Sequence, residues 1–238
     1  MPNVNNLSPI DKLAEYYTSK PSLQALALFL PQTTQLSGLL KLRADEIAKI
    51  RAKVFFEELD NGKMELTPKM IQSEDFVHRF VITAKAAVNT FRHEKIRRFA
   101  QLFRSSIQNN TIDNTDEYEE HLQIIDDLSE REYLLLCILE KYEKSLPLES
   151  IPYVECDQKD IQEYKEVKRA KSIWSEFTSE SSSCLNISSQ TTANMLTRIA
   201  RTGCYETLVS HLYFDKVHVE GKLTSTWFRI RSLVDEKD

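Results

Sequence analysis

The chain has 238 residues, of which 41% are hydrophobic and 28% are charged, and its formal net charge is −5. This composition can support a packed core and excludes a disordered chain. Four glycines and seven prolines are few for this length, and no two glycines are neighbours, which excludes a glycine-rich phosphate loop and disfavours a turn-rich β-sandwich or barrel. We therefore expect a mainly α fold.

The amino terminus and the cysteines bear on compartment. Residues 1–6 are polar and lack the basic and apolar segments of a secretory signal. The longest apolar stretch, Leu23 to Leu30, is far shorter than the roughly 20 residues of a membrane span, so we expect a short buried helix there, with a partner-docking segment as the alternative. The four cysteines have neither zinc-site nor CxxC spacing, which favours a cytoplasmic protein with reduced thiols.

Helical periodicity dominates the first half of the chain. Short helices are expected from Ser8 and over Ser22 to Leu30, followed by a long helix from Gln35 to Asp60. The strongest apolar stripe runs from Ser73 to about Ile107. Two helices of ordinary length are more common than one of this length, so we expect a break within residues 90–93.

Capping signals define the helices that follow. Asn114 and Glu117 can cap a helix that ends near Asp127, and Ser129 with Glu132 forms a capping box before the next one. Later segments are a linker over 146–158, a polar helix over 160–177, a mobile serine-rich loop over 178–189 and a helix over 190–202.

Strand patterning is confined to residues after Tyr205. Val217 and Val219 alternate with polar residues, Gly221 can form a turn, and Trp227 to Arg231 alternates again, which predicts a β-hairpin. We divide the chain into a helical domain, residues 1–127, and a second domain, residues 128–238.

The charges are strongly segregated in the first domain. The segment from Arg79 to Arg104 contains seven basic residues and one acidic residue. The segment from Asp113 to Glu130 contains eight acidic residues and no lysine or arginine. The basic block could bind phosphate. The interpretation we favour is that the helix around Arg92 to Arg104 lies against the acidic segment Asp116 to Asp127.

In the second domain, the order of three helices and a hairpin resembles a winged-helix domain. In that family the third helix enters the major groove and the wing touches the DNA backbone or minor groove. The resemblance implies contacts from Gln190, Asn194, Arg198 and Arg201 on the helix, and from Lys222, Arg229 and Arg231 on the wing. The long serine-rich loop departs from the usual three- or four-residue turn of a helix-turn-helix.

A second resemblance covers about a third of the chain. The stretches Glu94 to Phe103 and Leu128 to Glu132 are similar to segments of uncharacterised bacterial helical proteins. This resemblance implies a helical fold and carries over no catalytic residue.

Catalytic and metal-binding patterns are missing from the sequence. The five histidines have no HExxH or paired-ligand spacing, and no nucleophile motif is present, so we expect no enzyme activity, no metal site and no cofactor. The leading hypothesis is a cytosolic regulator that binds a macromolecule, with duplex DNA as a candidate. The alternative is a protein-interaction or homo-oligomerisation scaffold, for example in a stress or phage-response system.

Overall fold

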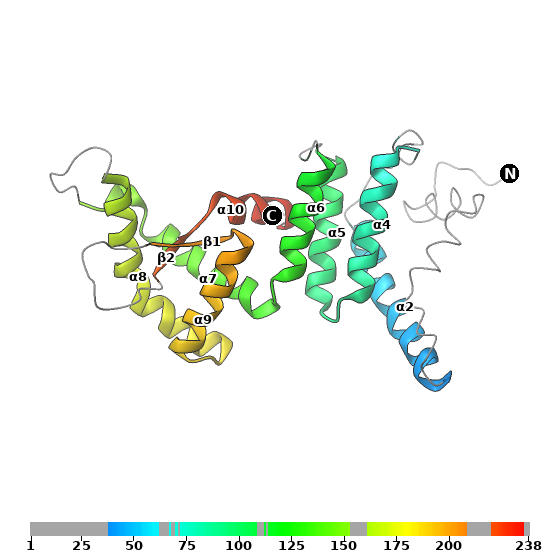
Figure 1. The fold of residues 1–238 in the computed structure, drawn as a ribbon, viewed down its shortest axis with the longest axis horizontal. Coiled ribbons are helices and arrows are strands. Elements are labelled where there is room, and N and C mark those ends of the chain that lie inside the picture. Colours follow the sequence, from blue (N-terminus) through cyan, green and yellow to red (C-terminus); the bar gives the residue numbers. More distant parts are fainter. Residues whose placement is uncertain are drawn as a thin grey trace. The chain divides into compact units, whose positions relative to one another are not determined.

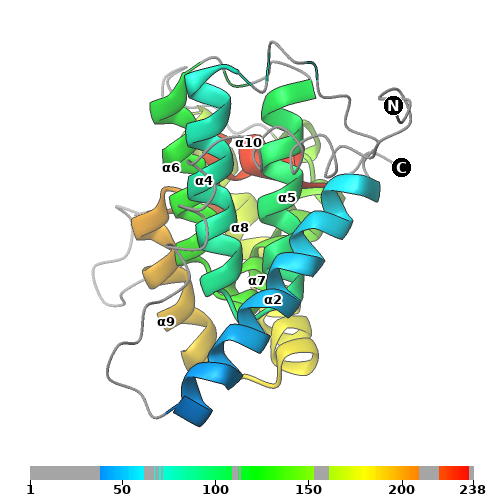
Figure 2. The ribbon, with the colours of Figure 1, turned by 90° about the vertical axis from the view of Figure 1, so that its right-hand side faces the viewer.

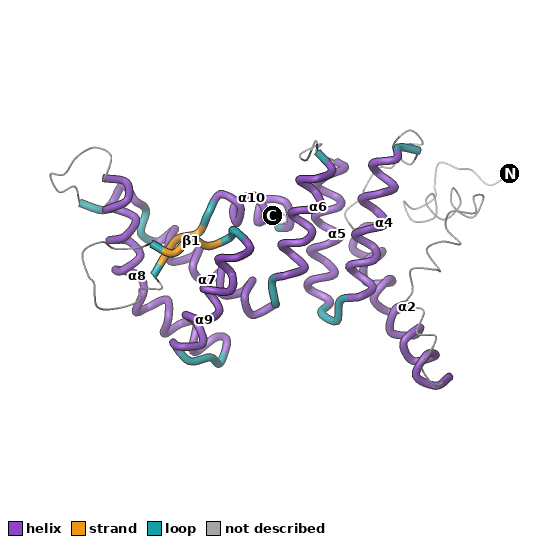
Figure 3. The backbone as a smooth tube through the Cα atoms, viewed as in Figure 1, coloured by secondary structure: helices purple, strands orange, loops and turns teal. Residues whose placement is uncertain are grey.

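A computed structural model of the chain describes residues 38–61, 67, 70, 72–108, 112, 114–152, 161–208 and 220–235. The described part is mainly helical, as predicted, with one small two-stranded antiparallel sheet (Figure 3). The predicted helices before residue 31 and the Val217–Val219 segment lie outside it. Among the described helices, none combines the length and the apolar character needed to cross a bilayer.

The chain forms two compact units, which are described separately. Unit 1 comprises Met1–Asp126 together with Ser232–Asp238, and unit 2 comprises Asp127–Arg231. From the sequence, we expected a division between residues 127 and 128 with the last residues in the second domain, whereas these last residues belong to unit 1.

Unit 1 is built from α2 (Gly38–Asn61), α4 (Glu74–Asn89), α5 (His93–Gln108) and α6 (Thr115–Asp127) (Figure 1). Figure 2 shows α2 crossing α5 at an angle, with α4 alongside. The predicted break is confirmed, since α4 ends at Asn89 and α5 begins at His93. Ser73 accepts a hydrogen bond from the Phe76 amide and so caps the first turn of α4.

The core of unit 1 is aromatic. The ring centroid of Phe103 on α5 lies 5.4 Å from that of Phe76 and 5.8 Å from that of Phe80, both on α4. Phe55 on α2 lies 6.3 Å from Phe80, and all four rings are buried. Phe76 and Phe80 are four residues apart, so one face of α4 presents both. The apolar stripe seen in the sequence is therefore the core face of unit 1.

Polar contacts attach α6 to this core. Tyr118 of α6 is fully buried and hydrogen-bonds Thr83 of α4, and the Arg79 guanidinium lies 5.3 Å from the Tyr118 ring centroid. The predicted pairing of basic and acidic segments is confirmed at Lys95, whose Nζ lies 3.8 Å from Asp126 Oδ1 and donates to the Asp126 carbonyl oxygen at 2.5 Å.

Unit 2 contains α7 (Glu130–Ser145), α8 (Ile161–Leu185), α9 (Ser189–Ile199) and the first seven residues of α10 (Ser225–Val234). Its two strands, β1 (Tyr205–Thr207) and β2 (Gly221–Leu223), pair antiparallel with Tyr205 opposite Leu223. Short 3₁₀ turns η3 (Leu148–Ser150) and η4 (Ala200–Thr202) follow α7 and α9. In the described residues, strand occurs only from Tyr205 onward, close to the prediction.

The core of unit 2 is organised by α7. The predicted capping box is confirmed, because Ser129 and Glu132 exchange side-chain and backbone hydrogen bonds at the start of this helix. The fully buried Trp227 of α10 stacks edge-on against Tyr133 of α7, with 5.2 Å between ring centroids. Its indole Nε1 donates to Glu140 Oε2 at 3.0 Å. A buried carboxylate thus ties α10 to α7.

The predicted serine-rich loop is wrong, because α8 continues through that tract to Leu185. Phe177, Ser181 and Leu185 are all buried and recur every four residues, so the tract has a core face with helical spacing. The Tyr142 hydroxyl of α7 also donates to Glu180 Oε2 at 2.7 Å. Serine is small enough to face a packed neighbour, and the packing overrides its weak helix propensity.

The predicted strand over Trp227 to Arg231 is also wrong, because these residues belong to α10. Thr224 caps this helix: its hydroxyl accepts from the Trp227 amide at 3.4 Å and its carbonyl from the Phe228 amide at 3.3 Å. Trp227 and Ile230, three residues apart, are fully buried. Two buried side chains at helical spacing therefore outweigh the short alternation of apolar and basic residues.

Candidate nucleic-acid interface

The turn between α8 and α9 has three residues, 186–188. Asn186 has a φ of 52°, the left-handed conformation that ends many helices, and the Ile187 amide donates to the Ser182 carbonyl at 3.3 Å. Ser188 then caps α9, since its hydroxyl accepts from the Thr191 amide at 3.1 Å. The long loop expected from the sequence is thus replaced by a turn of the length found in helix-turn-helix motifs.

The two faces of α9 are sharply divided. Met195, Leu196 and Ile199 are buried, while Gln190, Asn194 and Arg198 are exposed, as is Arg201 in the following turn η4. The face that carries the candidate contacts is therefore the exposed one. Gln190 Nε2 also donates to Asn194 Oδ1 at 3.2 Å, so these two amides, four residues apart, lie on the same face.

Arg198 is exposed but has an internal partner. Its Nε lies 2.5 Å from Oε1 of Glu132, while 55% of the Arg198 side chain and 5% of the Glu132 side chain are accessible to solvent. Burial alone would raise the pKa of Glu132, but the hydrogen bonds from Ser129 and Arg198 outweigh it and lower that pKa. Glu132 is therefore a carboxylate that both caps α7 and binds a cation from α9.

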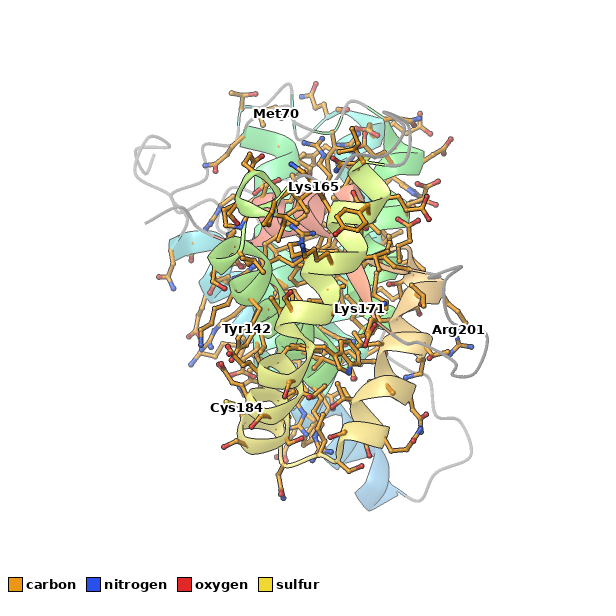
Figure 4. All side chains as sticks on the ribbon, turned by 90° about the vertical axis from the view of Figure 1, so that its left-hand side faces the viewer. Met70, Tyr142, Lys165, Lys171, Cys184 and Arg201 are labelled. Carbon is orange, nitrogen blue, oxygen red and sulfur yellow. The ribbon has the colours of Figure 1, made fainter. Side chains whose placement is uncertain are left out.

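Arg201 borders an open pocket at the carboxyl-terminal end of α9. The pocket lies within unit 2 and is lined by Asp127, Leu128, Glu132, Arg198, Arg201 and Thr202. Figure 4 shows the Arg201 side chain projecting from the surface of α9 and η4. Among the described residues, no hydrogen bond or ion pair involves the Arg201 guanidinium, so this charge is available to a ligand.

Lys222, the candidate on β2, is held by two carboxylates. Its Nζ lies 2.6 Å from Glu166 Oε2 on α8 and 3.4 Å from Glu206 Oε2 on β1. Burial would lower the pKa of Lys222, but these two carboxylates raise it, so the ammonium stays charged. The Lys222 ammonium is thus bound mainly by two carboxylates of unit 2.

The wing positions proposed for Arg229 and Arg231 need correction, because α10 carries both. Residues two apart on a helix point in different directions, so the two arginines do not form the clamp that a strand would give. Arg231 Nε lies 3.3 Å from Glu140 Oε2, and its Nη1 donates to the Tyr133 hydroxyl at 2.9 Å. Arg231 therefore contributes to the packing of α10 on α7.

Two carboxylates of α7, Glu140 and Glu143, were not predicted from the sequence. They bind groups on α8, β2 and α10 and so hold these elements against α7. Glu140 binds Trp227, Arg231 and Lys144, and Glu143 accepts from the Leu223 amide of β2 at 2.9 Å while it pairs with Arg169 of α8 at 3.2 Å. Burial raises the pKa of Glu143, and the Leu223 amide and Arg169 oppose that shift. The signal was present in the sequence, since Glu140 and Glu143 follow Leu136 at helical spacing on its apolar face.

In the described ranges, no three His, Cys, Asp or Glu side chains are placed to share an ion. His211 and His218 lie outside those ranges.

Comparison with known proteins gave no match to a family model, to a curated protein or to a solved structure.

Proposed function

We propose that unit 2 is a winged-helix-like module that binds duplex DNA, with α9 in the major groove, and that the protein is a non-enzymatic cytosolic regulator. The observation that carries this proposal is the α8–α9 junction: a three-residue turn followed by a short helix whose polar face is exposed. This arrangement, followed by an antiparallel strand pair, supports the proposal because it resembles the helices and wing of a winged-helix domain.

The exposed chemistry of α9 suits base edges and phosphate. Gln190 and Asn194 carry amides, which can pair with adenine in the major groove, and Arg201 carries a guanidinium, which can bind guanine or phosphate. Residues 186–202 include no aspartate or glutamate, so the turn and the helix present no carboxylate of their own to the DNA backbone. Arg198 can join them if it leaves Glu132.

The correction at α10 narrows the candidate contacts. Arg231 binds Glu140 and Tyr133. Arg229 lies on the same helix and not on a wing strand, so we leave both arginines of α10 out of the proposed interface. The proposed set is Gln190, Asn194, Arg198 and Arg201 on α9 and η4, with Lys222 as a secondary contact beside the strand pair.

The test is fluorescence anisotropy with a generic duplex at several salt concentrations. The first variant is Arg201→Ala, because this arginine makes no ion pair with a described residue and its removal should leave the melting temperature unchanged. We expect weaker binding and a plot of log K against log salt whose slope falls by about 0.9, the value for one lost phosphate contact.

A matched control removes an equal charge elsewhere in unit 2. Lys171→Ala changes an exposed lysine on α8, outside α9 and η4 (Figure 4). The control should bind with nearly the parent's affinity and salt dependence. If the parent does not bind duplex at low salt, or if the two variants weaken binding equally, the DNA proposal is wrong, and the protein-interaction module remains.

A further inference from the structure

The open pocket beside Arg201 has two sides of opposite charge. It encloses about 370 Å³, and we call it the Arg201 pocket. Its acidic side comes from the α6–α7 junction and the first turn of α7, and consists of Asp127, Leu128 and Glu132. Its basic side comes from α9 and η4, and consists of Arg198, Arg201 and Thr202. The two carboxylates and the two guanidinium groups balance each other in formal charge.

One ion pair joins the two sides. Arg198 Nε lies 2.5 Å from Glu132 Oε1, and only 5% of the Glu132 side chain is accessible to solvent. Although burial raises the pKa of Glu132, the hydrogen bonds from Ser129 and Arg198 lower it to a greater extent, so this carboxylate is charged at neutral pH. The pair holds the start of α7 and the end of α9 together, and a ligand therefore meets a site that is already formed.

The second pair of opposite charges is not joined. Asp127 and Arg201 are both exposed, and the Arg201 guanidinium makes no hydrogen bond or ion pair with any described residue, Asp127 included. Asp127 has other contacts, but a carboxylate can accept several hydrogen bonds and a guanidinium can donate five. Both groups therefore have hydrogen-bonding capacity left for a ligand.

The balance of charges selects the class of ligand. A multiply charged anion would be repelled by the two carboxylates, and a polyamine would be repelled by the two guanidinium groups. An α-amino acid carries a carboxylate and an ammonium on the same carbon, so it can meet the basic side with one and the acidic side with the other. The volume lies in the range of small-molecule sites, and Leu128 is the one apolar residue among those that line the pocket, which favours a short or polar side chain.

We propose that the Arg201 pocket binds a free α-amino acid, with the ligand carboxylate on Arg201 and Arg198 and the ligand ammonium on Asp127. The pocket shares both arginines with the proposed DNA contacts, so the bound amino acid competes with DNA for them. Binding of the amino acid is measured without DNA, so this inference and the DNA proposal can fail separately.

The first experiment is isothermal titration calorimetry of the full chain with each of the common L-amino acids in turn. We expect at least one of them to bind with a dissociation constant of about 1 mM or lower. Its N-acetyl derivative lacks the ammonium and its methyl ester lacks the carboxylate. Each derivative should bind at least about tenfold more weakly, because each loses hydrogen bonds to a charged group.

The second experiment assigns each charge of the ligand to a residue. Arg201→Ala and Asp127→Asn change exposed side chains, so the melting temperature without ligand should stay close to that of the parent. Each variant should bind the amino acid at least about tenfold more weakly. Arg201→Ala should also discriminate less between the amino acid and its methyl ester, and Asp127→Asn less between the amino acid and its N-acetyl derivative. The control Lys171→Ala, on α8 and outside the pocket, should bind as the parent does.

Four results would overturn the proposal. They are a parent that binds none of the amino acids, a derivative that binds as tightly as the amino acid itself, a Lys171→Ala control as weak as Arg201→Ala, and a fall in the ligand-free melting temperature of Arg201→Ala. The last result would mean that Arg201 serves the stability of unit 2 and not a ligand.

Discussion

In unit 1, phenylalanine rings from α2, α4 and α5 occupy the centre, whereas in unit 2 the central helix α7 places Glu140 and Glu143 among the buried side chains. Rings stabilise by the area they remove from water and need no particular partner. A buried carboxylate is stable only where donors meet it, and here the donors come from α8, β2 and α10. The described core of unit 1 therefore gathers aromatic rings at its centre, whereas that of unit 2 combines apolar side chains with paired carboxylates.

The largest effect should come from the aromatic core. Phe103→Ala removes a fully buried ring that touches Phe76 and Phe80, at an expected cost of about 3–5 kcal/mol. Hydrogen exchange should show the loss of protection mainly in α4 and α5. Both tryptophans, Trp174 and Trp227, lie in unit 2, so their emission should change less than the helical circular dichroism. An equal loss of protection in α7 would mean that the two units unfold together.

A second variant tests the polar core. Glu143→Gln retains an acceptor for the Leu223 amide but removes the charge that pairs with Arg169, whose side chain is 12% exposed. Leaving this arginine without its partner should cost about 1–3 kcal/mol. Protection should fall in β2 and α8, and tryptophan emission should report the transition. A neutral result would show that apolar packing dominates unit 2 as well.

These contrasts explain what the sequence could predict. Apolar periodicity located α4 and α5, and short capping patterns located the starts of α6 and α7, because both signals are local. The serine-rich end of α8 was missed because its helix depends on packing near Tyr142 of α7, which is distant in sequence. The strand wrongly predicted at Trp227 shows the same limit, since five alternating residues cannot outweigh two buried contacts.

The candidate interface was predicted in part for the same reason. The exposure of Asn194 and Arg198 follows from the spacing of the apolar residues of α9, and Arg201 is exposed in η4. The partners of Arg198, Lys222 and Arg231 could not be predicted, because each lies more than 50 residues away or on another element. Among Arg198, Arg201, Lys222 and Arg231, only the Arg201 guanidinium has no hydrogen bond or ion pair with a described residue.

A third variant tests the close approach of the two strands. A Cβ added at Gly221 would lie 2.1 Å from the Glu206 carbonyl oxygen and 2.4 Å from the Tyr205 hydroxyl oxygen. Backbone must therefore move in Gly221→Ala, and we expect a cost of at least about 1–3 kcal/mol, the range for overpacking. Thermal denaturation followed by tryptophan emission measures it. An unchanged midpoint would show that the strand pair contributes little to unit 2.

The smallest effect should come from Glu132→Gln, which separates the capping role of this residue from its charge. Glutamine can replace glutamate in a capping box, so α7 should keep its first turn. Only the ion pair with Arg198 is lost, and because that arginine is more than half exposed the cost should be about 0.2–1 kcal/mol.

The difference in stability between this variant and the parent should depend on pH, in a direction set by the pKa of Glu132. The pKa of Glu132 in the folded protein is lowered from its ordinary value of 4.5, so the parent gains stability from the charged form above that value and loses it as the pH falls through the lowered pKa. The difference in melting temperature between parent and Glu132→Gln should thus be present at pH 7 and shrink below about pH 4. If unit 2 binds DNA, the variant should also bind more tightly, because Arg198 is released and a nearby negative charge is removed. Tighter binding that Arg198→Ala fails to reverse would mean that the lost charge, and not the released arginine, causes the gain.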